Sequence, residues 1–314
     1  HRSGGTGIAA TDHGGPVTRS RQRRGCDNAG VDRQRRRGGA WCERRDIGID
    51  FGCHRRLAGY SGGNRIGIAV AGDNVGARGE HRTRVAAGAE GRIDIQKLAF
   101  DLSARRAGEA LSAKLAAPAL QLDAGNVTTF PAFVERLRQA LRDTWQRDSF
   151  DHLINNAGHG DMASIADTTE AQFDALVNVH FKGVFFLSQA LLPLMADGGR
   201  IVNISSGLTR VSYPGFSAYS AVKGAVEVLS LYMAKELGSR GIAVNTVAPG
   251  AIETDFLGGA VRDMPDLNKV FADMTALGRV GVPDDIGPLV ASLLQPATRW
   301  VNAQRIEASG GMFL

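Results

Sequence analysis

The chain has 314 residues, a formal net charge of +5 and three cysteines. This length accommodates one large α/β domain or two smaller domains. The cysteines lack the paired Cys-x-x-Cys spacing of a structural zinc site, so no metal is expected. No run of about 18 apolar residues and no secretory signal occur, so we expect a cytoplasmic protein that does not span a membrane.

Charge divides the chain into two sections. Residues 1–96 hold 18 Arg, no Lys and 10 acidic residues, for a net charge of +8, whereas residues 97–314 carry a net charge of −3. The basic character belongs to the first section and gives no reason to infer a nucleic-acid partner for the whole protein. We expect residues 1–96 to be an irregular Arg/Gly-rich section and residues 97–314 to be a single folded domain.

Residues 1–60 show little sustained periodicity and contain clusters of Arg among glycines. Three interpretations remain open: a basic disordered arm that binds nucleic acid or acidic lipid, a solvated low-complexity segment without a role, and a stretch translated in the wrong frame or from too far upstream. The last interpretation fits best with the absence of Lys and with a first methionine at Met162.

The first regular pattern lies at residues 65–70, which predict a strand. Residues 71–78 follow with two glycines at the separation of a phosphate-binding loop, but Arg78 stands where a third glycine belongs. Glycines in such a loop let the backbone approach a pyrophosphate at a helix N-terminus. Residues 65–85 are interpreted either as a degraded first β-α unit or as a chance match in a glycine-rich section.

Regular periodicity returns near residue 97. Residues 97–101 predict a strand that ends at Asp101, residues 104–115 a helix, and residues 118–122 a strand that ends at Asp123. In dinucleotide-binding folds an acid at the end of the second strand bonds the ribose 2′-hydroxyl and repels a 2′-phosphate, so Asp101 favours NAD over NADP. The alternative is that Asp101 caps the following helix.

Three apolar segments are predicted to be strands that deliver polar loops to one edge of a parallel sheet. The segments are residues 150–154, residues 201–205 (after a predicted turn at Gly198 and Gly199) and residues 242–247. The loops that follow them contain Asn155 to Gly158, Ser206, and Pro249 to Thr254, respectively. Because the carboxyl ends of parallel strands meet at the usual ligand side of such a sheet, we expect these loops to form a site.

Residues 217–237 predict a helix in which Tyr219 and Lys223, four residues apart, share one face. A phenol with a reference pKa near ~10 loses its proton more easily beside an ammonium group. Tyr219 is therefore a candidate acid–base group, with the Ser206 hydroxyl near the same substrate oxygen. The alternative is that Tyr219 and Lys223 are surface residues of an amphipathic helix, and the motifs around them disfavour it.

At these positions the chain resembles the short-chain dehydrogenase/reductase family. The matching motifs occur in the family's order and are Asn155 to Gly158, Ser206, Tyr219, Lys223, and Asn245 through Pro249 and Gly250 to Thr254. The resemblance covers about residues 120–313. It implies an α/β fold with a doubly wound, Rossmann-like parallel sheet in a single domain, and an NAD(P)-dependent oxidoreductase that transfers a hydride between nicotinamide and a carbonyl or alcohol.

The resemblance also implies roles for individual residues. Tyr219 exchanges a proton with the substrate oxygen, Ser206 hydrogen-bonds that oxygen, and Lys223 lowers the phenol pKa and binds the nicotinamide ribose. His180 stands where many relatives have an Asn whose backbone helps to hold a relay water; it either takes part in that relay or is a packed histidine. The expected cofactor-binding residues are Asp101, Asp123, Ala124, Asn155, Ala157, Gly158, Tyr219, Lys223, Pro249, Gly250, Ile252 and Thr254.

Residues 255–280 are expected to form a lid over the substrate. Its apolar side chains, which either contact the substrate or pack the lid on the body, are Phe256, Leu257, Met264, Leu267 and Phe271. They suggest an uncharged, partly apolar carbonyl or alcohol, and relatives of this kind form homo-tetramers or dimers. Two alternatives remain open. One is a catalytically impaired dinucleotide-binding scaffold or sensor, because no convincing glycine loop stands in the sequence; the other is a nucleic-acid-binding protein that acts through its basic N-terminal arm.

Overall fold

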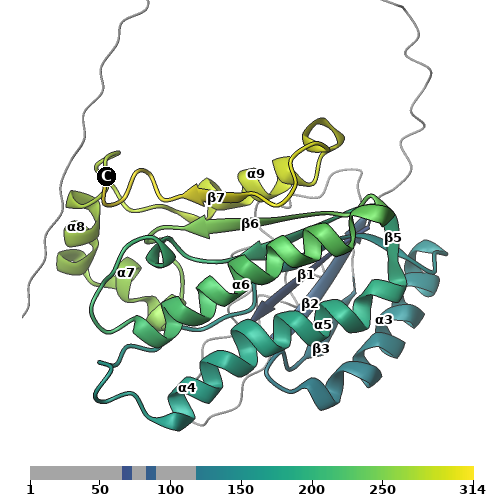
Figure 1. Ribbon diagram of the computed structural model, residues 1–314, viewed down its shortest axis with the longest axis horizontal. Coiled ribbons are helices and arrows are strands. Elements are labelled where there is room, and N and C mark those ends of the chain that lie inside the picture. The colour runs from purple at the N-terminus through teal and green to yellow at the C-terminus, as the bar shows by residue number, and fades with distance from the viewer. Residues whose placement is uncertain (1–65, 73–82, 90–117) are drawn as a thin grey trace, which may run out of the picture. The chain divides into compact units, whose positions relative to one another are not determined.

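A single sheet and the helices that cover it make up the described part of the protein. The structure is a computed structural model, and it describes residues 66–72, 83–89 and 118–314 (Figure 1). All of them belong to one compact unit, which runs from Tyr60 to Leu314. The predictions for residues 1–60, for the strand at 97–101 and for the helix at 104–115 lie outside the described residues.

Seven strands form the sheet within this described part. They are β1 (Ile66–Gly72), β2 (Thr83–Ala89), β3 (Ala119–Leu122), β4 (Phe150–Asn155), β5 (Met195–Ile204), β6 (Ala243–Pro249) and β7 (Arg305–Ala308). Their order across the sheet is β3-β2-β1-β4-β5-β6-β7. The order reverses between β1 and β4, as in a doubly wound sheet, so the predicted α/β fold class is confirmed.

Strand β2 departs from the predicted parallel arrangement. Strands β1, β4, β5, β6 and β7 run parallel, whereas β2 is antiparallel to both of its neighbours, β1 and β3. Parallel neighbours need a crossover of about a dozen residues or more, and the connection at residues 73–82 is shorter than that. The structure therefore has two antiparallel strands, β1 and β2, in the section where a degraded β-α unit was one of two interpretations, and the sheet begins before residue 97.

Helices cover the sheet on both faces. The α-helices are α3 (Phe130–Trp145), α4 (Glu170–Val177), α5 (Val184–Leu191), α6 (Ser217–Glu236), α7 (Ala260–Asp263), α8 (Pro265–Asp273) and α9 (Pro283–Leu293). The short helical segments are η1 (Val127–Thr129), the π-helical η2 (Asn178–Gly183), η3 (Leu192–Leu194), η4 (Gly207–Thr209), η5 (Gly238–Arg240), η6 (Phe256–Gly259) and η7 (Pro296–Thr298).

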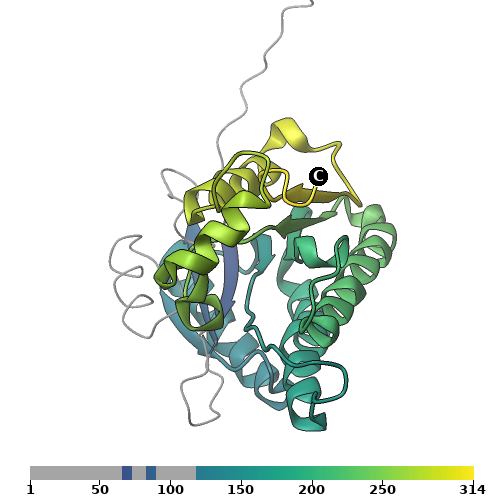
Figure 2. The same ribbon diagram turned by 90° about the vertical axis from the view of Figure 1, so that its left-hand side faces the viewer.

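Two apolar cores lie on opposite faces of the sheet. On one face Ile201 of β5 packs with buried residues of α3 and α5. On the other face the next residue, Val202, packs with buried residues of α9. Successive side chains of a strand point to opposite faces, which explains why these two neighbours belong to different cores. Figure 2 shows helices on either side of the sheet.

The helical stretch Glu170–Leu194 is continuous, with η2 between α4 and α5. By length and composition alone this stretch is apolar enough to cross a membrane. An interior helix of a globular domain passes the same test, and here Val179, Leu187 and Leu191 are buried in the core between helices and sheet. We therefore interpret the stretch as a core helix of the domain.

Candidate active site

The candidate site lies at the carboxyl edge of the parallel strands. Strand β4 ends at Asn155, β5 at Ile204 and β6 at Pro249, and these three strands are neighbours in the sheet. Strand β1 reaches the same edge, because Val70 pairs in parallel with Asn155. The predicted loops therefore leave adjacent strands at the edge where open α/β sheets bind their ligands.

Tyr219 and Lys223 lie on the inner face of α6. Their exposed fractions are 6% and 5%, which excludes the alternative of a solvated helix surface. Lys223 Nζ donates a hydrogen bond to the carbonyl oxygen of Ile204 at 2.8 Å, and it lies 5.8 Å from the centroid of the Tyr219 ring. One turn of helix thus holds a buried phenol and a buried amine side by side at the end of β5.

Ser206 completes the predicted group from the loop after β5. The side chain is buried, and its Oγ accepts a hydrogen bond from the Leu208 backbone N–H at 3.2 Å as the N-cap of η4. Ser206 also acts on Tyr219, because its side chain lowers the pKa of the phenol. The structure therefore brings Ser206, Tyr219 and Lys223 together from one strand end and one helix.

Burial controls the ionisation of Tyr219 and Lys223. It raises the pKa of Tyr219 above its usual value, and the hydrogen bond with Ser206 opposes that rise. It lowers the pKa of Lys223 to about 7. The predicted lowering of the phenol pKa by Lys223 is thus not found, because desolvation disfavours the charged forms of both groups, including the ammonium that would act on the phenol. At neutral pH Tyr219 is a neutral phenol that can donate a proton.

His180 lies against Tyr219 from η2. Its ring is buried and stands edge-on to the Tyr219 ring with centroids 5.4 Å apart, and its Nε2 lies 2.7 Å from the carbonyl oxygen of His159. A Cβ at Gly158 would lie 2.5 Å from His180 Cε1, so only glycine fits at that position. His180 is therefore packed between the β4 loop and Tyr219, as one of the two interpretations expected, and it contacts the phenol ring.

The loop after β4 presents small residues at the edge of the sheet, as predicted, but the Asn155 side chain has a different use. Its Nδ2 donates hydrogen bonds to Asn203 Oδ1 at 2.8 Å and to Ser188 Oγ at 3.1 Å. This buried amide ties β4 to β5 and α5. A cofactor can therefore approach the backbone of this loop at Ala157 and Gly158, while the Asn155 amide serves the fold.

Asp123 and Ala124 follow β3, where the sequence predicted contacts with the adenine end of a cofactor. Asp123 Oδ1 accepts a hydrogen bond from the Gly125 backbone N–H at 2.9 Å and so caps the turn. Ala124 is buried, and a Cβ on Gly183 of η2 would collide with its carbonyl oxygen. The turn after β3 therefore packs directly on the central helix, and a glycine is needed at the contact.

The loop after β6 is fastened to β7 and to the lid. The predicted cofactor-binding residues in it are Pro249, Gly250, Ile252 and Thr254. The backbone N–H of Gly250 donates to the carbonyl oxygen of Ala308 at 3.1 Å, and Ile252 forms an isolated parallel bridge with Gly281. Thr254 Oγ1 accepts a hydrogen bond from the Phe256 backbone N–H at 3.2 Å, where the lid begins.

The described edge fits the nicotinamide end of a dinucleotide. It offers the hydroxyl of Ser206, the phenol of Tyr219 and the amine of Lys223 between the loops after β4 and β6. Asp101 and residues 73–78 of the candidate glycine loop lie outside the described residues and stay predictions. The last residue of β1, Gly72, is at this same edge, so the chain that leads into that segment leaves the sheet at the site.

The lid packs its apolar side chains over Tyr219. The ring centroids of Phe256 and Tyr219 are 5.6 Å apart, and a Cβ on Gly160 would lie 2.6 Å from both Phe256 and Leu257. These two lid residues therefore contact the body beside Tyr219. Met264, by contrast, is exposed on the outside of the lid.

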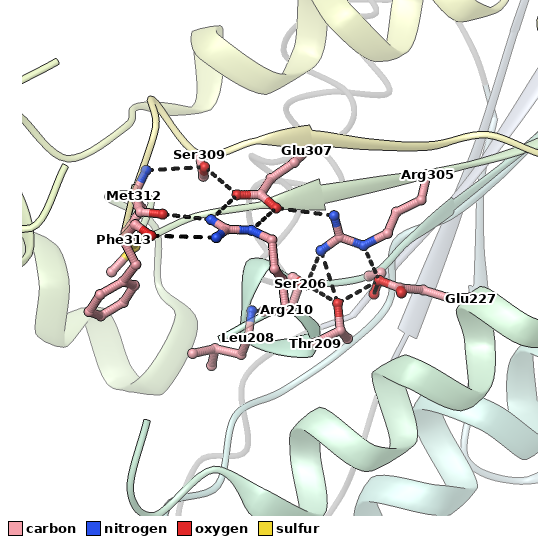
Figure 3. A network of polar contacts seen from close by, with 11 residues as sticks. Ser206, Leu208, Thr209, Arg210, Glu227, Arg305, Glu307, Ser309, Met312 and Phe313 are labelled. Atoms are coloured by element: carbon pink, nitrogen blue, oxygen red, sulfur yellow. Dashed lines mark hydrogen bonds and ion pairs between the residues drawn. The ribbon is translucent and has the colours of Figure 1, made fainter. Parts of the chain in front are cut away.

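Two residues near Ser206, Glu227 and Arg305, lie outside every motif recognised in the sequence. Glu227 Oε1 accepts hydrogen bonds from Arg305 Nε at 2.8 Å and from Ser205 Oγ at 2.7 Å (Figure 3). Glu227 lies four residues after Lys223, so helical spacing alone places it on the same face of α6. Arg305 gives no comparable signal, because it comes from β7, which is 78 residues further along the chain.

Comparison with known proteins identifies related sequences. A family model described as Enoyl-(Acyl carrier protein) reductase matches residues 87–313. The protein named Dehydrogenase OXI1 from Cochliobolus heterostrophus is 36% identical over 169 residues, which cover 53% of this chain and 73% of that protein. An Arabidopsis thaliana protein named NADPH-dependent aldehyde reductase-like protein, chloroplastic, is 41% identical over 164 residues, which cover 51% of this chain and 60% of that protein.

Solved structures of reductases share the fold. The angucycline C-6 ketoreductase LanV with bound NADP is 32% identical with a TM-score of 0.62, and the match covers 70% of this chain and 90% of that chain. The promiscuous reductase LugOII is 40% identical with a TM-score of 0.57, covering 60% of this chain and 75% of that chain. Fold and site together define an oxidoreductase that uses a nicotinamide dinucleotide. The chain belongs to the short-chain dehydrogenase/reductase family.

Proposed function

We propose that the protein reduces the carbonyl group of a small molecule to an alcohol, and catalyses the reverse reaction, with a nicotinamide dinucleotide. The observation that carries this proposal is the buried group of Ser206, Tyr219 and Lys223 at the carboxyl edge of the sheet. The names of the related reductases and dehydrogenases support it.

Tyr219 is the proton donor in the reducing direction. When bound, the reduced dinucleotide supplies the hydride that forms the new C–H bond at the carbonyl carbon. The phenol of Tyr219 gives its proton to the carbonyl oxygen, which has taken up the electron pair of the broken π bond, so that an alcohol and a phenolate result. Ser206 donates a hydrogen bond to the same oxygen and holds it beside the phenol.

Lys223 is the charge partner of the phenolate. Because burial lowers its pKa to about 7, its amine can gain or lose a proton near neutral pH. A phenolate that forms one helical turn away favours the protonated ammonium, and the ammonium in turn stabilises the phenolate. The edge contact of His180 fixes the plane of the Tyr219 ring, so we propose a positioning role for His180, with a part in proton relay as the alternative.

We propose NADPH as the working cofactor. LanV is described with bound NADP, and the Arabidopsis relative is named NADPH-dependent. The opposing prediction from Asp101, which favours NAD, concerns a residue outside the described part.

Thermal unfolding with added NADPH or NADH tests the choice of cofactor, because a ligand that binds the folded state raises Tm. A larger rise with NADH would assign NAD instead. No rise with either cofactor would contradict the enzyme proposal, and binding without turnover on a panel of carbonyl compounds would favour a scaffold or sensor.

We propose an uncharged, partly apolar ketone or aldehyde as the substrate. Apolar and aromatic side chains gather around Tyr219: Phe216 and Phe256 have ring centroids 6.3 and 5.6 Å from that of Tyr219, and Leu257 packs in the same cluster. Such a lining favours apolar groups beside the reacting carbonyl. Apolar ketones should therefore show a higher kcat/KM than 2-keto acids of similar size, and the opposite order would contradict this substrate class.

The variant Tyr219→Phe tests the proton donor. It removes the hydroxyl and keeps the ring, so we expect turnover to fall by about 10²–10⁴-fold, the usual contribution of general acid catalysis. NADPH binding should change by no more than about twofold, since the ring and its neighbours stay in place. Tyr232→Phe is the matched control, because Tyr232 lies on the same helix with an exposed side chain. Retained turnover in Tyr219→Phe would remove Tyr219 from this role.

We propose that the protein is a cytoplasmic homo-dimer or homo-tetramer. The exposed apolar side chains Phe185 and Phe186 on α5 and Val228 and Leu231 on α6 support an interface there. Leu231→Asp should lower the mass measured by light scattering, and a monomeric parent protein would contradict the proposal.

Cell fractionation tests the proposed cytoplasmic location. Nucleic-acid binding through residues 1–96 stays an alternative prediction, on which no described residue bears.

A further inference from the structure

A network of two arginines and two glutamates surrounds the turn that carries Ser206 (Figure 3). Its charged members come from different parts of the chain. Glu227 lies on α6, Arg305 and Glu307 lie on β7, and Arg210 is the residue that follows η4. The side chains of these four residues are between 20% and 38% exposed. Ion pairs that are partly shielded from water and hydrogen-bonded on both sides hold their geometry better than fully exposed pairs.

Glu227 gathers the residues on either side of Ser206. Its Oε1 lies 2.7 Å from Ser205 Oγ, 2.7 Å from Thr209 Oγ1 and 2.8 Å from Arg305 Nε. Ser205 is the residue before Ser206, and Thr209 closes the turn that Ser206 begins. One carboxylate oxygen on α6, the helix that also bears Tyr219 and Lys223, therefore fixes both flanks of the turn.

Arg305 contacts the turn directly. Its Nη2 donates to the Ser206 carbonyl oxygen at 3.3 Å and to Thr209 Oγ1 at 2.9 Å. The same guanidinium also reaches Glu307 Oε2 from Nη1 at 3.1 Å. Arg305 thus holds the backbone of Ser206, the residue whose side chain lowers the pKa of Tyr219, while its own position is set by carboxylates on two sides.

Arg210 extends the network to the C-terminal residues. It forms a two-pronged pair with Glu307, with Nε–Oε2 and Nη2–Oε1 distances of 2.7 Å, and its Nη2 donates to the Met312 carbonyl oxygen at 2.6 Å. The C-terminal residues in turn pair with the chain just after α8, where the Phe313 backbone N–H donates to the Met274 carbonyl oxygen at 2.9 Å. The Ser206 turn, β7 and the end of the lid are therefore linked through two arginines.

We propose that Glu227 and Arg305 are positioning residues for the reaction, which hold the Ser206 turn at the distance from Tyr219 that proton transfer requires and fasten it, through Glu307 and Arg210, to the C-terminal strand. The inference rests on the proposed carbonyl reduction. It adds to the three site residues a network of two positive and two negative charges, which acts on the site through the Ser206 turn.

The comparison of Arg305→Met with Arg147→Met tests the inference. Arg147 pairs with Asp151 at the opposite end of β4, and the exposures of that pair, 28% and 17%, match the 27% and 20% of Arg305 and Glu227. Both substitutions remove a half-buried ion pair, but only Arg305→Met releases the Ser206 turn. We expect kcat to fall by about tenfold in Arg305→Met, because small displacements of a reacting group are costly, and to stay within about twofold in Arg147→Met. NADPH affinity should change little in either variant.

The pH profile of alcohol oxidation separates positioning from loss of stability. Oxidation needs the phenolate of Tyr219, and the hydrogen bond from Ser206 lowers the phenol pKa. A displaced Ser206 should therefore shift the rise of kcat to higher pH, and we expect the same direction of shift in Ser206→Ala. Lys223 and His180, the other ionisable groups that lie against the Tyr219 ring within the described residues, are unchanged in these variants.

Glu227→Gln supplies an independent test of the positioning role. It removes a negative charge, whereas Arg305→Met removes a positive one, so a purely electrostatic effect on the phenol would shift the two profiles in opposite directions. Positioning predicts a shift to higher pH in both, with partial recovery of kcat in Arg305→Lys. If Arg305→Met does not fold, Glu227→Gln and Arg305→Lys decide the question.

The outcomes are distinguishable from failure of the proposed function. The positioning role would be overturned if Arg305→Met or Glu227→Gln kept the kcat and pH profile of the parent, or if Arg147→Met lost as much kcat as Arg305→Met. In each of these cases Tyr219→Phe would still be inactive, so the proposed function would stand. Retained turnover in both Tyr219→Phe and Ser206→Ala would overturn the proposed function itself.

Discussion

Lys223 loses almost all contact with water where α6 meets the end of β5, and its pKa falls to about 7. In an unfolded chain the same amine has a reference pKa of about 10.4. Between these values the unfolded chain binds a proton at this position that the folded chain does not. The free energy of unfolding should therefore fall as the pH is lowered from about 10 towards 7, by at most about 1.4 kcal/mol per pH unit.

Lys223→Met should remove this dependence, because the methionine side chain does not titrate. Urea unfolding at about pH 7.5 and about pH 8.5, where the Tyr219 phenol stays protonated in both states, measures the slope for parent and variant. Lys269→Met is the control, since Lys269 lies on the outer face of α8 in an exposed pair with Asp273. Equal slopes in Lys223→Met and the parent would contradict the buried, neutral amine.

The sequence predicted that Ser206, Tyr219 and Lys223 lie together, but it did not predict their electrostatic state. The spacing of Tyr219 and Lys223 placed them on one helix face, and the strand before Ser206 placed that residue at the sheet edge. The direction of the Tyr219 pKa shift depends on how completely His180, Phe256 and the end of β5 exclude water. That exclusion is a property of packing between distant segments, which local spacing does not report.

Among the elements, α6 and the lid offer two glycines with opposite requirements. Gly224 lies inside α6, and Gly258 lies in η6 with φ at 70°; a Cβ would meet nothing within 4 Å at either position. Alanine in the helix reduces the entropy of the unfolded chain, so Gly224→Ala should stabilise the protein by about 0.5–1 kcal/mol. Alanine with a left-handed backbone is strained, so Gly258→Ala should destabilise it by about 1 kcal/mol.

The pair is measured by urea unfolding under one set of conditions. Because the chemical change is the same and neither site has a steric clash, the sign of each effect reports the backbone conformation alone. Two changes of the same sign would contradict the helical assignment of Gly224 or the left-handed turn at Gly258.

Element bounds were predictable where the local pattern is strong. The helix predicted at 217–237 is α6 (Ser217–Glu236), and the strand predicted at 150–154 is β4 (Phe150–Asn155). Gly198 and Gly199, where the sequence predicted a turn, lie in an irregular part of β5: Gly198 has a φ of 74°, and the ladder with β4 shifts register between Phe150 and His152. The glycines therefore mark a local break in the ladder, while the strand continues on both sides of it.

At the scale of the whole molecule, ion pairs between distant segments make the free energy of unfolding depend on pH in the acidic range. Arg210, Ser309 and Arg305 lower the pKa of Glu307 to about 2, with the Arg210 hydrogen bonds as the largest cause. A depressed carboxyl pKa contributes stability that is complete above the unfolded value of about 4.3 and is lost as the pH falls towards 2. Glu307→Gln should therefore flatten the decline in the free energy of unfolding between about pH 5 and pH 2.

The measurement is a series of urea unfolding curves across that range. Glu135→Gln serves as the control, because Glu135 pairs with Arg138 on an exposed turn of α3. A decline as steep in Glu307→Gln as in the parent would show that other carboxylates dominate acid unfolding.

Long-range pairing was the least predictable part of the molecule. Strand β2 reads Thr-Arg-Val-Ala-Ala-Gly-Ala, with few of the branched or aromatic residues that mark strands, and its antiparallel direction follows from the short connection to β1. The contact between Glu227 and Arg305 joins a helix to the last strand, and neither residue belongs to a local motif.

The reversal at β2 has a consequence for the entropy of cofactor binding. Gly72 pairs with Thr83, so the connection between β1 and β2 both leaves and re-enters the sheet at the carboxyl edge, beside Asn155. Its two ends are thus fixed close together before any ligand arrives, and the cost of closing the segment is already included in folding. Positioning the two strand ends is therefore already part of the folding equilibrium, and it adds nothing to the entropy cost of binding a ligand at this edge.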